Sequence, residues 1–332
     1  MRPIPSMHRR RVHCARNGLA ALLLAAAAAA PAAREFRDTL ADGSPGPVLV
    51  EVPAGRVRLG SPDSEAGRRP AEGPVHEVSV GAFALGRTEV SRGEFAAFVR
   101  ATGYVTDAER DTPVPDKSDT YGCFVPVGSL KPEWKRGSSW RAFGVAQDDR
   151  HPVACISWND AHAYVSWLGR ATGKAYRLPT EAEQEYAIRA GSTTPWPWGE
   201  NPDGGCRFAN GADISGRAYA RSAFGVVSTV MFASSHCDDG HGATAPVASL
   251  APNAFGLYDT VGNVSEWSGD CYIPYARQLA GERPAAVADC VRYAIRGMAW
   301  SDEPVWLRSA IRMLLPRTSR YHNVGLRVAR DL

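Results

Sequence analysis

The chain has 332 residues, of which 44% are hydrophobic, 9% aromatic and 22% charged, and this composition excludes a disordered or fibrous protein. The formal net charge is +3, but the first 33 residues carry five arginines and no acidic residue. Without that segment the 38 lysines and arginines fall to 33, against 35 acidic residues, so the basicity belongs to the N-terminal segment. A nucleic-acid-binding surface is therefore not expected.

Residues 1–33 have the features of a secretory signal peptide. A basic head is followed by an apolar run at Leu19–Ala30 and by the cleavage pattern Ala30-x-Ala32. The alternative is a membrane anchor, but twelve apolar residues, mostly alanine, are too few to cross about 30 Å of hydrocarbon. We expect a periplasmic or secreted protein with no membrane span in its mature form. Three arginines starting at Arg9 leave the general and the twin-arginine export routes both open.

The mature chain keeps an even number of cysteines, because Cys14 leaves with the leader. They are Cys123, Cys155, Cys206, Cys237, Cys271 and Cys290. In an exported protein an even set predicts disulfides. We predict Cys206 with Cys237 and Cys271 with Cys290, because each pair brackets one turn-rich loop, and the remaining two pair by elimination. The alternative is that some of the six are free buried thiols.

Residues 34–47 are polar and rich in glycine and proline, which predicts a linker between the leader and the folded part. No second linker and no internal repeat follows, so residues 48–332 are predicted to form one domain. Alternating apolar residues at Val48–Leu59 and His76–Leu85 predict two strand-forming runs that pair in an antiparallel sheet.

Three helices are predicted from their N-terminal caps. Ser91–Arg100 has Glu94 three residues after a serine cap, a second helix begins in the same way at Ser157, and a third begins at Thr180, which forms a capping box with Glu183. The 24 prolines and 32 glycines of the chain are spread through long stretches without a period. Such loops bury too little apolar surface to offset their ordering entropy, so we expect disulfides or metal ions to hold them.

Several motifs follow one another in a fixed order: GRTEVS at 86–91, HPVACISWNDA at 151–161, RLPTEAE at 177–183, NAFGLYD at 253–259, GNVSEW at 262–267, RGMAW at 296–300 and GLRVA at 325–329. Over Val48–Arg330 the chain resembles the sulfatase-modifying-factor, or formylglycine-generating-enzyme, family. The resemblance implies the fold of that family, a loop-rich α+β domain with little regular secondary structure that is related in plan to C-type lectins.

The resemblance also implies two structural calcium sites built from oxygen atoms, which a hard cation prefers. The first takes the side chains of Asp259 and Glu266 and the carbonyl oxygens of Gly262 and Val264. The second takes the side chains of Asn210 and Asp239 and the carbonyl oxygens of Gly211 and His241. The alternative is that these side chains only accept hydrogen bonds from backbone amides in turns.

The oxidase of this family holds copper(I) with a Cys-x4-Cys pair in the closing motif, and the copper activates oxygen to turn a substrate cysteine into formylglycine. Here Asp302 and Leu307 stand at the two cysteine positions, and Ala299 stands at the position of an active-site serine. Copper(I) is a soft ion that prefers thiolates, and no Cys-x4-Cys occurs in the chain. We therefore expect neither copper nor formylglycine-generating activity, because activity depends on the site and not on the fold.

The closing segment offers two other interpretations. Its polar and aromatic residues could line a groove that binds an extended partner or a small ligand: Trp300, Asp302, Glu303, Arg308 and Arg312. Alternatively, Arg308, Arg312 and Arg327 pair with acidic residues and hold loops together.

Two further hypotheses depend on other residues. His236 and His241 flank Cys237, the nearest approach to a metal cluster, and they would support a divergent oxidoreductase acting on a peptide or metabolite unless Cys237 is in a disulfide. Trp196 and Trp198, in a Trp-Pro-Trp-Gly run, are either a carbohydrate platform or core and loop anchors.

The sequence thus predicts an exported, monomeric, disulfide-tied and calcium-stabilised family member. We expect it to act as a binding or accessory module toward an unidentified protein or small molecule. A divergent oxidoreductase and a sulfatase-maturing oxidase are the alternatives.

Overall fold

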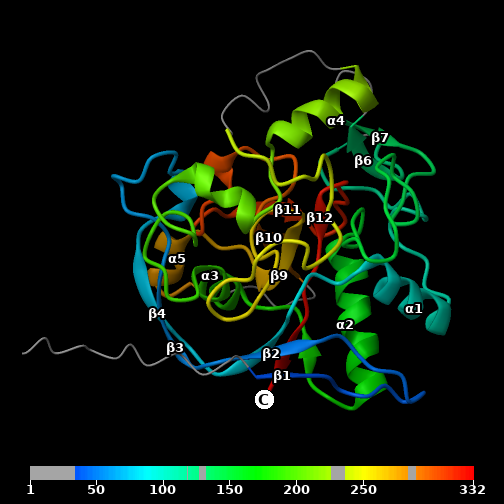
Figure 1. Cartoon of the computed structure of the whole chain (residues 1–332). Coiled ribbons are helices and arrows are strands. Elements are labelled where there is room, and N and C mark those ends of the chain that lie inside the picture. The colour runs from blue at the N-terminus through cyan, green and yellow to red at the C-terminus, as the bar shows by residue number, and fades with distance from the viewer. Residues whose placement is uncertain (1–33, 118, 127–131, 226–235, 283–288) are drawn as a thin grey trace, which may run out of the picture. The chain divides into compact units, whose positions relative to one another are not determined.

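The two ends of the described domain meet in one antiparallel sheet (Figure 1). The computed structural model describes residues 34–117, 119–126, 132–225, 236–282 and 289–332, so the predicted leader lies outside the described residues. The strand order is β1-β2-β5-β13-β8. The bounds in that order are Glu35–Phe36, Leu49–Val52, Phe83–Gly86, Ala329–Asp331 and Tyr176–Arg177.

Strand β1 corrects the predicted linker at 34–47. Glu35 pairs with Val50 and Phe36 with Leu49, so this segment enters the sheet instead of standing outside the domain. A two-residue strand has no period that sequence reasoning can detect, and its pairing depends on β2. Strand β1 therefore belongs to the same compact unit as the other described residues.

The two predicted strand-forming runs are confirmed, and each contains two strands. The first run holds β2 and β3 (Gly55–Leu59), and the second holds β4 (His76–Val80) and β5. β3 pairs with β4 and β2 pairs with β5, both antiparallel as predicted.

A second sheet lies at the centre of the fold and positions the segments of interest (Figure 1). Its order is β11-β10-β9-β12, with the bounds Met313–Pro316, Arg292–Arg296, Ser265–Cys271 and Val324–Gly325. β12 runs parallel to β9, and the other pairs are antiparallel. The closing motif leaves β10, and the predicted calcium loop leads into β9. A separate pair is formed by β6 (Cys123–Pro126) and β7 (Pro132–Lys135).

The three predicted helices are present and begin at the predicted caps. They are α1 (Arg92–Thr102), α2 (Trp158–Thr172) and α3 (Glu181–Arg189). Each cap side chain accepts a hydrogen bond from the backbone amide three residues later, which satisfies one free amide of the first turn. These signals are local in sequence, so they could be read without knowledge of the fold.

Two helices were not predicted, α4 (Ile214–Phe224) and α5 (Tyr275–Leu279). In α4 only Gly216 and Ala220 are buried, so the helix has no apolar stripe to detect. α5 has five residues, too few for a periodic pattern. Short 3-10 helices complete the set: η1 (Pro70–Glu72), η3 (Pro202–Arg207) and η5 (Pro304–Trp306).

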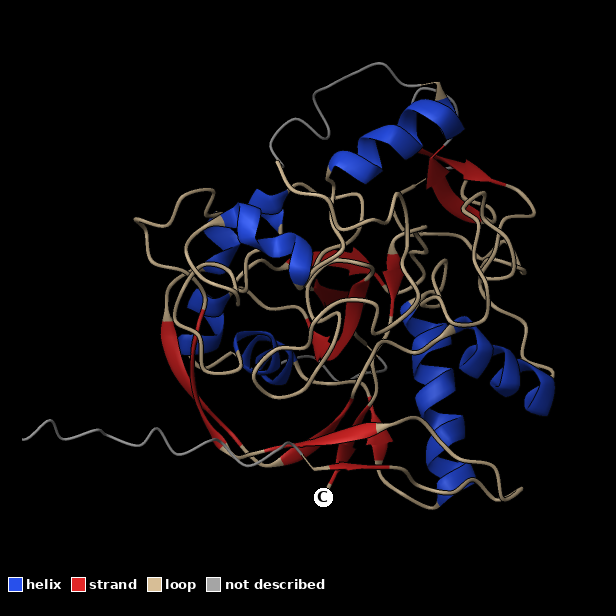
Figure 2. Cartoon of the chain, in the orientation of Figure 1, coloured by secondary structure: helices blue, strands red, loops and turns tan. Residues whose placement is uncertain are grey.

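The main core joins α1, α2 and both sheets. Trp158 of α2 stacks on Tyr293 of β10 with ring centroids 3.9 Å apart, and its Nε1 donates to the Ser268 carbonyl oxygen at 2.9 Å. Around this core Figure 2 shows long loops between short helices and strands. No helix of the described residues is long and apolar enough to cross a membrane.

Three disulfides hold the loops, and they join the pairs that the sequence analysis predicts. Cys123 bonds Cys155, Cys206 bonds Cys237, and Cys271 bonds Cys290. The first fastens β6 to the segment before α2, and the third closes the loop between β9 and β10. The alternative of free thiols is therefore excluded for these six residues.

Candidate functional site

The closing segment turns sharply after β10. Gly297 and Met298 have φ angles of 84° and 56°, and a Cβ at Gly297 would lie 3.0 Å from the Thr260 carbonyl oxygen. The Asp302 carboxylate accepts a hydrogen bond from the Ala299 amide at 2.9 Å. Burial raises the pKa of Asp302 to about 6. Asp302 thus closes the turn that places the rest of the segment.

The other positions that the resemblance assigns to an active site also have packing roles. Leu307 is 4% exposed, and its Cδ1 lies 2.6 Å from where a Cβ at Gly211 would stand, so only glycine leaves room for it. Ala299 is buried in a cluster with Trp300. Every cysteine in the described part of the chain is in a disulfide, so none of them supplies a thiolate.

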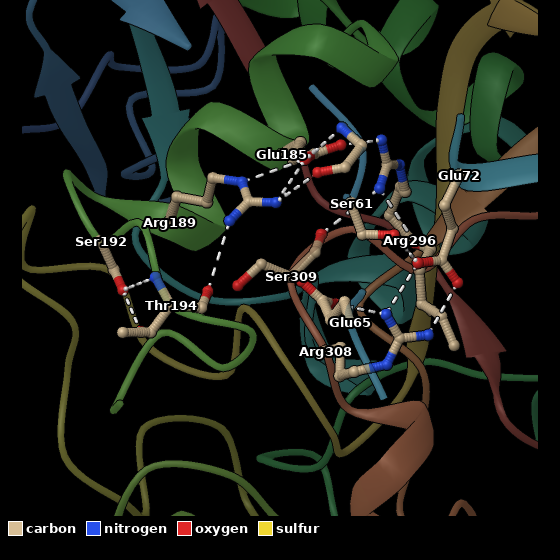
Figure 3. Close-up of polar contacts among 12 residues, drawn as sticks. Ser61, Glu65, Glu72, Glu185, Arg189, Ser192, Thr194, Arg296, Arg308 and Ser309 are labelled. Atoms are coloured by element: carbon tan, nitrogen blue, oxygen red, sulfur yellow. Dashed lines mark hydrogen bonds and ion pairs between the residues drawn. The ribbon is translucent and has the colours of Figure 1, made fainter. Parts of the chain in front are cut away.

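The predicted polar groove is wrong for its two arginines, which are buried. Arg308 and Arg312 are 2% and 1% exposed. Arg308 makes a two-pronged ion pair with Glu72, with both N–O distances at 2.7 Å, and a second pair with Glu65 (Figure 3). Arg312 pairs through two nitrogens with Glu181. The alternative interpretation, in which these arginines hold loops together, is the one that the structure shows.

The other three residues of the predicted groove differ in exposure. Trp300 is 3% exposed and lies edge-on to His322, with ring centroids 5.6 Å apart. The side chain of Asp302 turns back to Ala299. Glu303 is partly exposed and precedes η5, where its carbonyl oxygen accepts from the Trp306 amide at 2.8 Å.

A second buried ion-pair centre surrounds Glu185 (Figure 3). Its carboxylate pairs with Arg296 at 2.6 Å and with Arg189 at 2.9 Å, and it accepts from the Gly60 amide at 2.9 Å. Although burial favours the neutral acid, the charges of Arg296 and Arg189 bring the pKa of Glu185 below its usual value. The buried acid is therefore ionised and fully partnered.

A cavity of about 250 Å³ lies beside these ion pairs, lined among others by Arg58, Glu65, Arg189 and Ser192. Glu65 is held by Arg308, and Arg189 is held by Glu185. Glu65 and Arg189 therefore already have partners and serve as rigid walls of this cavity.

The predicted calcium loop is shaped by three left-handed residues. Asp259, Gly262 and Asn263 have φ angles of 52°, 81° and 57°. A Cβ at Gly262 would lie 2.2 Å from the Asn210 carbonyl oxygen, so this position requires glycine. The carboxylate of Asp259, which is 3% exposed, accepts from the Ala248 amide at 2.7 Å.

Glu89 adds a third buried carboxylate to this loop, and sequence reasoning missed it. It is 1% exposed and accepts hydrogen bonds from the Val264 amide at 2.9 Å and from Asn263 Nδ2 at 2.7 Å. Glu266 is paired with Arg327 at 2.7 Å. The available signal was the place of Glu89 in the GRTEVS motif, as a single acid between a buried strand and a capped helix.

This acidic cluster contains more carboxyl groups than cationic groups. Burial, with the charges of Asp259 and Glu266, raises the pKa of Glu89 well above its usual value. Burial also raises the pKa of Glu266, and it raises that of Asp259 to about 6. Within the described residues, Arg327 is the one cationic group whose charge lowers the pKa of all three acids, and it forms an ion pair with Glu266.

The second predicted calcium site contains a buried oxygen without a partner. Asn210 donates from Nδ2, but its Oδ1 is buried and accepts no hydrogen bond from any described residue. Asp239 accepts from the Gly211 amide at 3.1 Å and from the His241 amide at 2.7 Å. Burial and the charge of Asp213 raise the pKa of Asp239 to about 7.

Both predicted sites fit a hard cation in donor type and in charge. An unpaired buried amide oxygen costs about 1–3 kcal/mol, and a bound cation would remove that cost. Within the described ranges, no group of three or more His, Cys, Asp or Glu side chains could hold a metal ion by itself. A cation here would accordingly need amide and carbonyl oxygens as well, as a calcium ion commonly does. The same carboxylates also accept backbone amides, so the two interpretations of these residues are compatible.

The histidine cluster around Cys237 does not offer a thiolate. Cys237 is bonded to Cys206, and His236 is a mostly exposed residue whose Nδ1 lies 3.3 Å from Asp203. His241 uses its backbone amide to reach Asp239. The soft-metal site considered for this segment is therefore ruled out in the form that used Cys237.

The chain is similar to known proteins over most of its length. The sulfatase-modifying factor enzyme 1-like domain matches residues 36–332. The chain is 37% identical to the formylglycine-generating enzyme of Streptomyces coelicolor, over 85% of this chain and 88% of that protein. It is 30% identical to the inactive C-alpha-formylglycine-generating enzyme 2 of Mus musculus, over 77% of this chain and 75% of that one.

Among solved structures the chain is similar to PvdO from Pseudomonas aeruginosa. The TM-score is 0.65 at 32% identity, covering 92% of this chain and 100% of that chain. The predicted loop-rich α+β fold is thereby confirmed, together with the resemblance on which it was based.

Proposed function

Because the chain belongs to the sulfatase-modifying factor enzyme 1-like domain family, we propose that it is an exported member without formylglycine-generating activity that acts as a monomeric binding or accessory module. One observation carries the proposal. Asp302 and Leu307, at the positions that would bear a thiolate pair, are built into the structure as a turn cap and a packing residue. Neither side chain is a ligand for copper(I).

Two further observations support parts of this proposal. A relative at 30% identity carries the name of an inactive formylglycine-generating enzyme, so loss of the activity on this scaffold has a named precedent. Three disulfides are typical of proteins that mature in an oxidising compartment, which supports export.

An activity assay tests the proposal directly. The purified protein is incubated, with and without copper, with a peptide that carries the cysteine of a sulfatase, and the peptide is analysed by mass spectrometry. The Streptomyces coelicolor enzyme serves as the positive control. We expect an unmodified cysteine. Conversion to formylglycine by this protein would overturn the proposal and restore sulfatase maturation as the function.

We also propose that calcium stabilises the module at the two loops. Asn210 and Asp239 would hold one ion with the carbonyl oxygens of Gly211 and His241. Asp259 and Glu266 would hold the other with the carbonyl oxygens of Gly262 and Val264. The ion would supply positive charge to buried oxygens, of which Asn210 Oδ1 is unpartnered among the described residues. Elemental mass spectrometry of protein purified without chelators should find one or two calcium ions and no copper or iron.

A divergent oxidoreductase is the second candidate, and one cavity favours it. This cavity of about 270 Å³ is lined among others by Trp158, His162, Thr180 and Asp270. Burial raises the pKa of Asp270 to about 6, closer to neutral pH, and lowers that of His162. Stoichiometric iron or copper in the purified protein would place this candidate first, and its absence from active protein would remove it.

A further inference from the structure

A separate cavity of about 320 Å³ lies between α3, η3 and the loop that leads to Asp259. It is lined by the end of α3, by Pro197 and Trp198, by Phe208, and by residues of 251–261. This volume is at the lower end of the range for small-molecule sites. None of the ion pairs of Arg308 or Arg312 borders it, and the closing motif does not contribute to its walls.

Trp198 and Phe208 form the aromatic wall of this cavity. Their rings are parallel to within 2°, with centroids 6.5 Å apart, and both residues are partly exposed. Trp198 is held in place because its Nε1 donates to the Asn201 carbonyl oxygen at 3.0 Å and its ring lies on Gly205, where a Cβ would stand 2.6 Å away. The ring is thus oriented before any ligand arrives.

The two tryptophans of the Trp-Pro-Trp-Gly run therefore have different roles. Trp196 is 8% exposed, and its Nε1 donates to the Pro304 carbonyl oxygen at 2.7 Å, so it anchors the loop to η5. Trp198 faces the cavity. Of the two hypotheses for this run, the anchor applies to Trp196, and the platform stays a prediction for Trp198.

The polar side of the cavity offers a hydroxyl group from Thr260 and a carboxylate from Asp259. The Asp259 carboxylate accepts from the Ala248 amide through Oδ2. Arg189 also borders the cavity, but Glu185 and the Gly60 carbonyl oxygen already accept its hydrogen bonds. An anionic ligand is disfavoured here, and a neutral ligand with hydroxyl groups is favoured.

We propose that this cavity binds a neutral pyranose ring, with its C–H face on Trp198 and a hydroxyl group on Thr260. The C–H face of a sugar is weakly positive and packs on the negative face of an aromatic ring, while its hydroxyl groups supply both donors and acceptors. The proposal rests on the binding role given above and names its ligand class.

Saturation-transfer NMR on the full chain tests this assignment. The probes are the methyl glycosides of glucose, galactose, mannose and N-acetylglucosamine, with indole as an apolar aromatic comparison. We expect transfer to at least one glycoside. Trp198→Ala should weaken binding about tenfold or more, and Trp134→Ala, which removes an indole from β7 outside the cavity, should leave it unchanged.

Thr260 provides a matched pair that does not alter the aromatic wall. Thr260→Val should weaken glycoside binding about fivefold, whereas Thr260→Ser, which keeps the hydroxyl group, should retain it. Thermal unfolding of each variant identifies any that fails to fold. Absence of transfer to every glycoside, glycoside binding that survives both Trp198→Ala and Thr260→Val, or saturable binding of indole alone would overturn the proposal.

The same preparation is assayed for formylglycine formation, so that the two proposals fail separately. Formylglycine formation with glycoside binding would overturn only the proposed function. No activity and no glycoside binding would overturn only the ligand class.

Discussion

Arg308 and Arg312 are each paired with a buried glutamate. In contrast, three buried acids share a single arginine, Arg327; these acids are Glu89, Asp259 and Glu266. Around Arg308 the positive charge meets Glu72 and Glu65, with the Gly67 carbonyl oxygen as a further acceptor. Around Asp259 the acids have raised pKa values because burial is not offset by enough positive charge.

The difference separates buried charge that is balanced within the fold from buried acids that are not. A buried ion pair with matched hydrogen bonds needs nothing more from outside, and its contribution is to fix which loops meet. A buried group with excess acid is stable only if protons or a metal ion balance it. The Arg308 pairs therefore act as staples, and the loop around Asp259 is where the proposed calcium ion would contribute to stability.

The largest expected effect comes from breaking a staple. Arg308→Met leaves Glu72 and Glu65 buried without their cation, and we expect a loss of about 3–5 kcal/mol in the free energy of unfolding. Arg56→Met is the matched control, because its pair with Glu77 joins side chains that are 72% and 54% exposed. That change should cost less than about 1 kcal/mol. Urea unfolding at pH 7 measures both, and equal losses would show that Arg308 is not a staple.

Chelation should have the next largest effect. At a free calcium concentration of 100 times Kd, a bound ion stabilises the folded state by about 2.7 kcal/mol, and a chelator removes this term. Calorimetry with and without chelator should show a lower Tm that calcium restores. Asp259→Asn should reduce this response, whereas Arg56→Met should keep it. An unchanged Tm in the presence of chelator would mean that the excess acids bind no cation.

His322 is a third kind of buried titratable group, because its side chain is neutral at pH 7. Burial lowers its pKa to about 4, and its Nδ1 lies 3.3 Å from the Phe124 carbonyl oxygen, to which a protonated Nδ1 would donate. Between this value and the unfolded pKa of about 6.5, the unfolded chain binds more protons, so stability falls as the pH falls.

We expect the His322 contribution to be on the order of 2 kcal/mol between pH 7 and pH 4.5. His322→Gln should reduce the slope of unfolding free energy against pH, and His236→Gln, at an exposed site, should leave it unchanged. Parallel slopes for the wild type and His322→Gln would contradict this account.

Sequence reasoning succeeded where a signal is local. The caps at Ser91, Ser157 and Thr180 act within one helical turn, so three helices could be predicted from a few residues each. Helix α4 was missed because it buries only two small residues, and β1 was missed because its register depends on β2. In both cases tertiary packing decides the structure.

The candidate site also contains features that local sequence signals predict and others that depend on tertiary packing. The arginines of the closing segment could be seen in the sequence, but their partners could not: Arg312 meets Glu181 across 131 residues, and Arg308 meets Glu65 across 243. No pattern in one sequence reports such a pairing, so an arginine that lines a groove and one that is buried in a staple look alike. Gly262 is different, because its left-handed backbone conformation favours glycine, and a glycine can be read directly from the sequence.

The smallest effect tests whether Asp302 is a cap or a functional group. Asp302→Ala removes the acceptor for the buried Ala299 amide, and we expect a loss of about 1 kcal/mol, whereas Asp302→Asn keeps an acceptor and should lose less. Its backbone carbonyl oxygen, which accepts from Ala212, is retained in both variants. Urea unfolding measures the two losses, and glycoside binding is recorded in parallel. If Asp302→Ala leaves stability unchanged but abolishes binding or turnover, then Asp302 has a function of its own. A loss of stability with binding intact would instead mean that Asp302 is purely structural, as its hydrogen bond to Ala299 indicates.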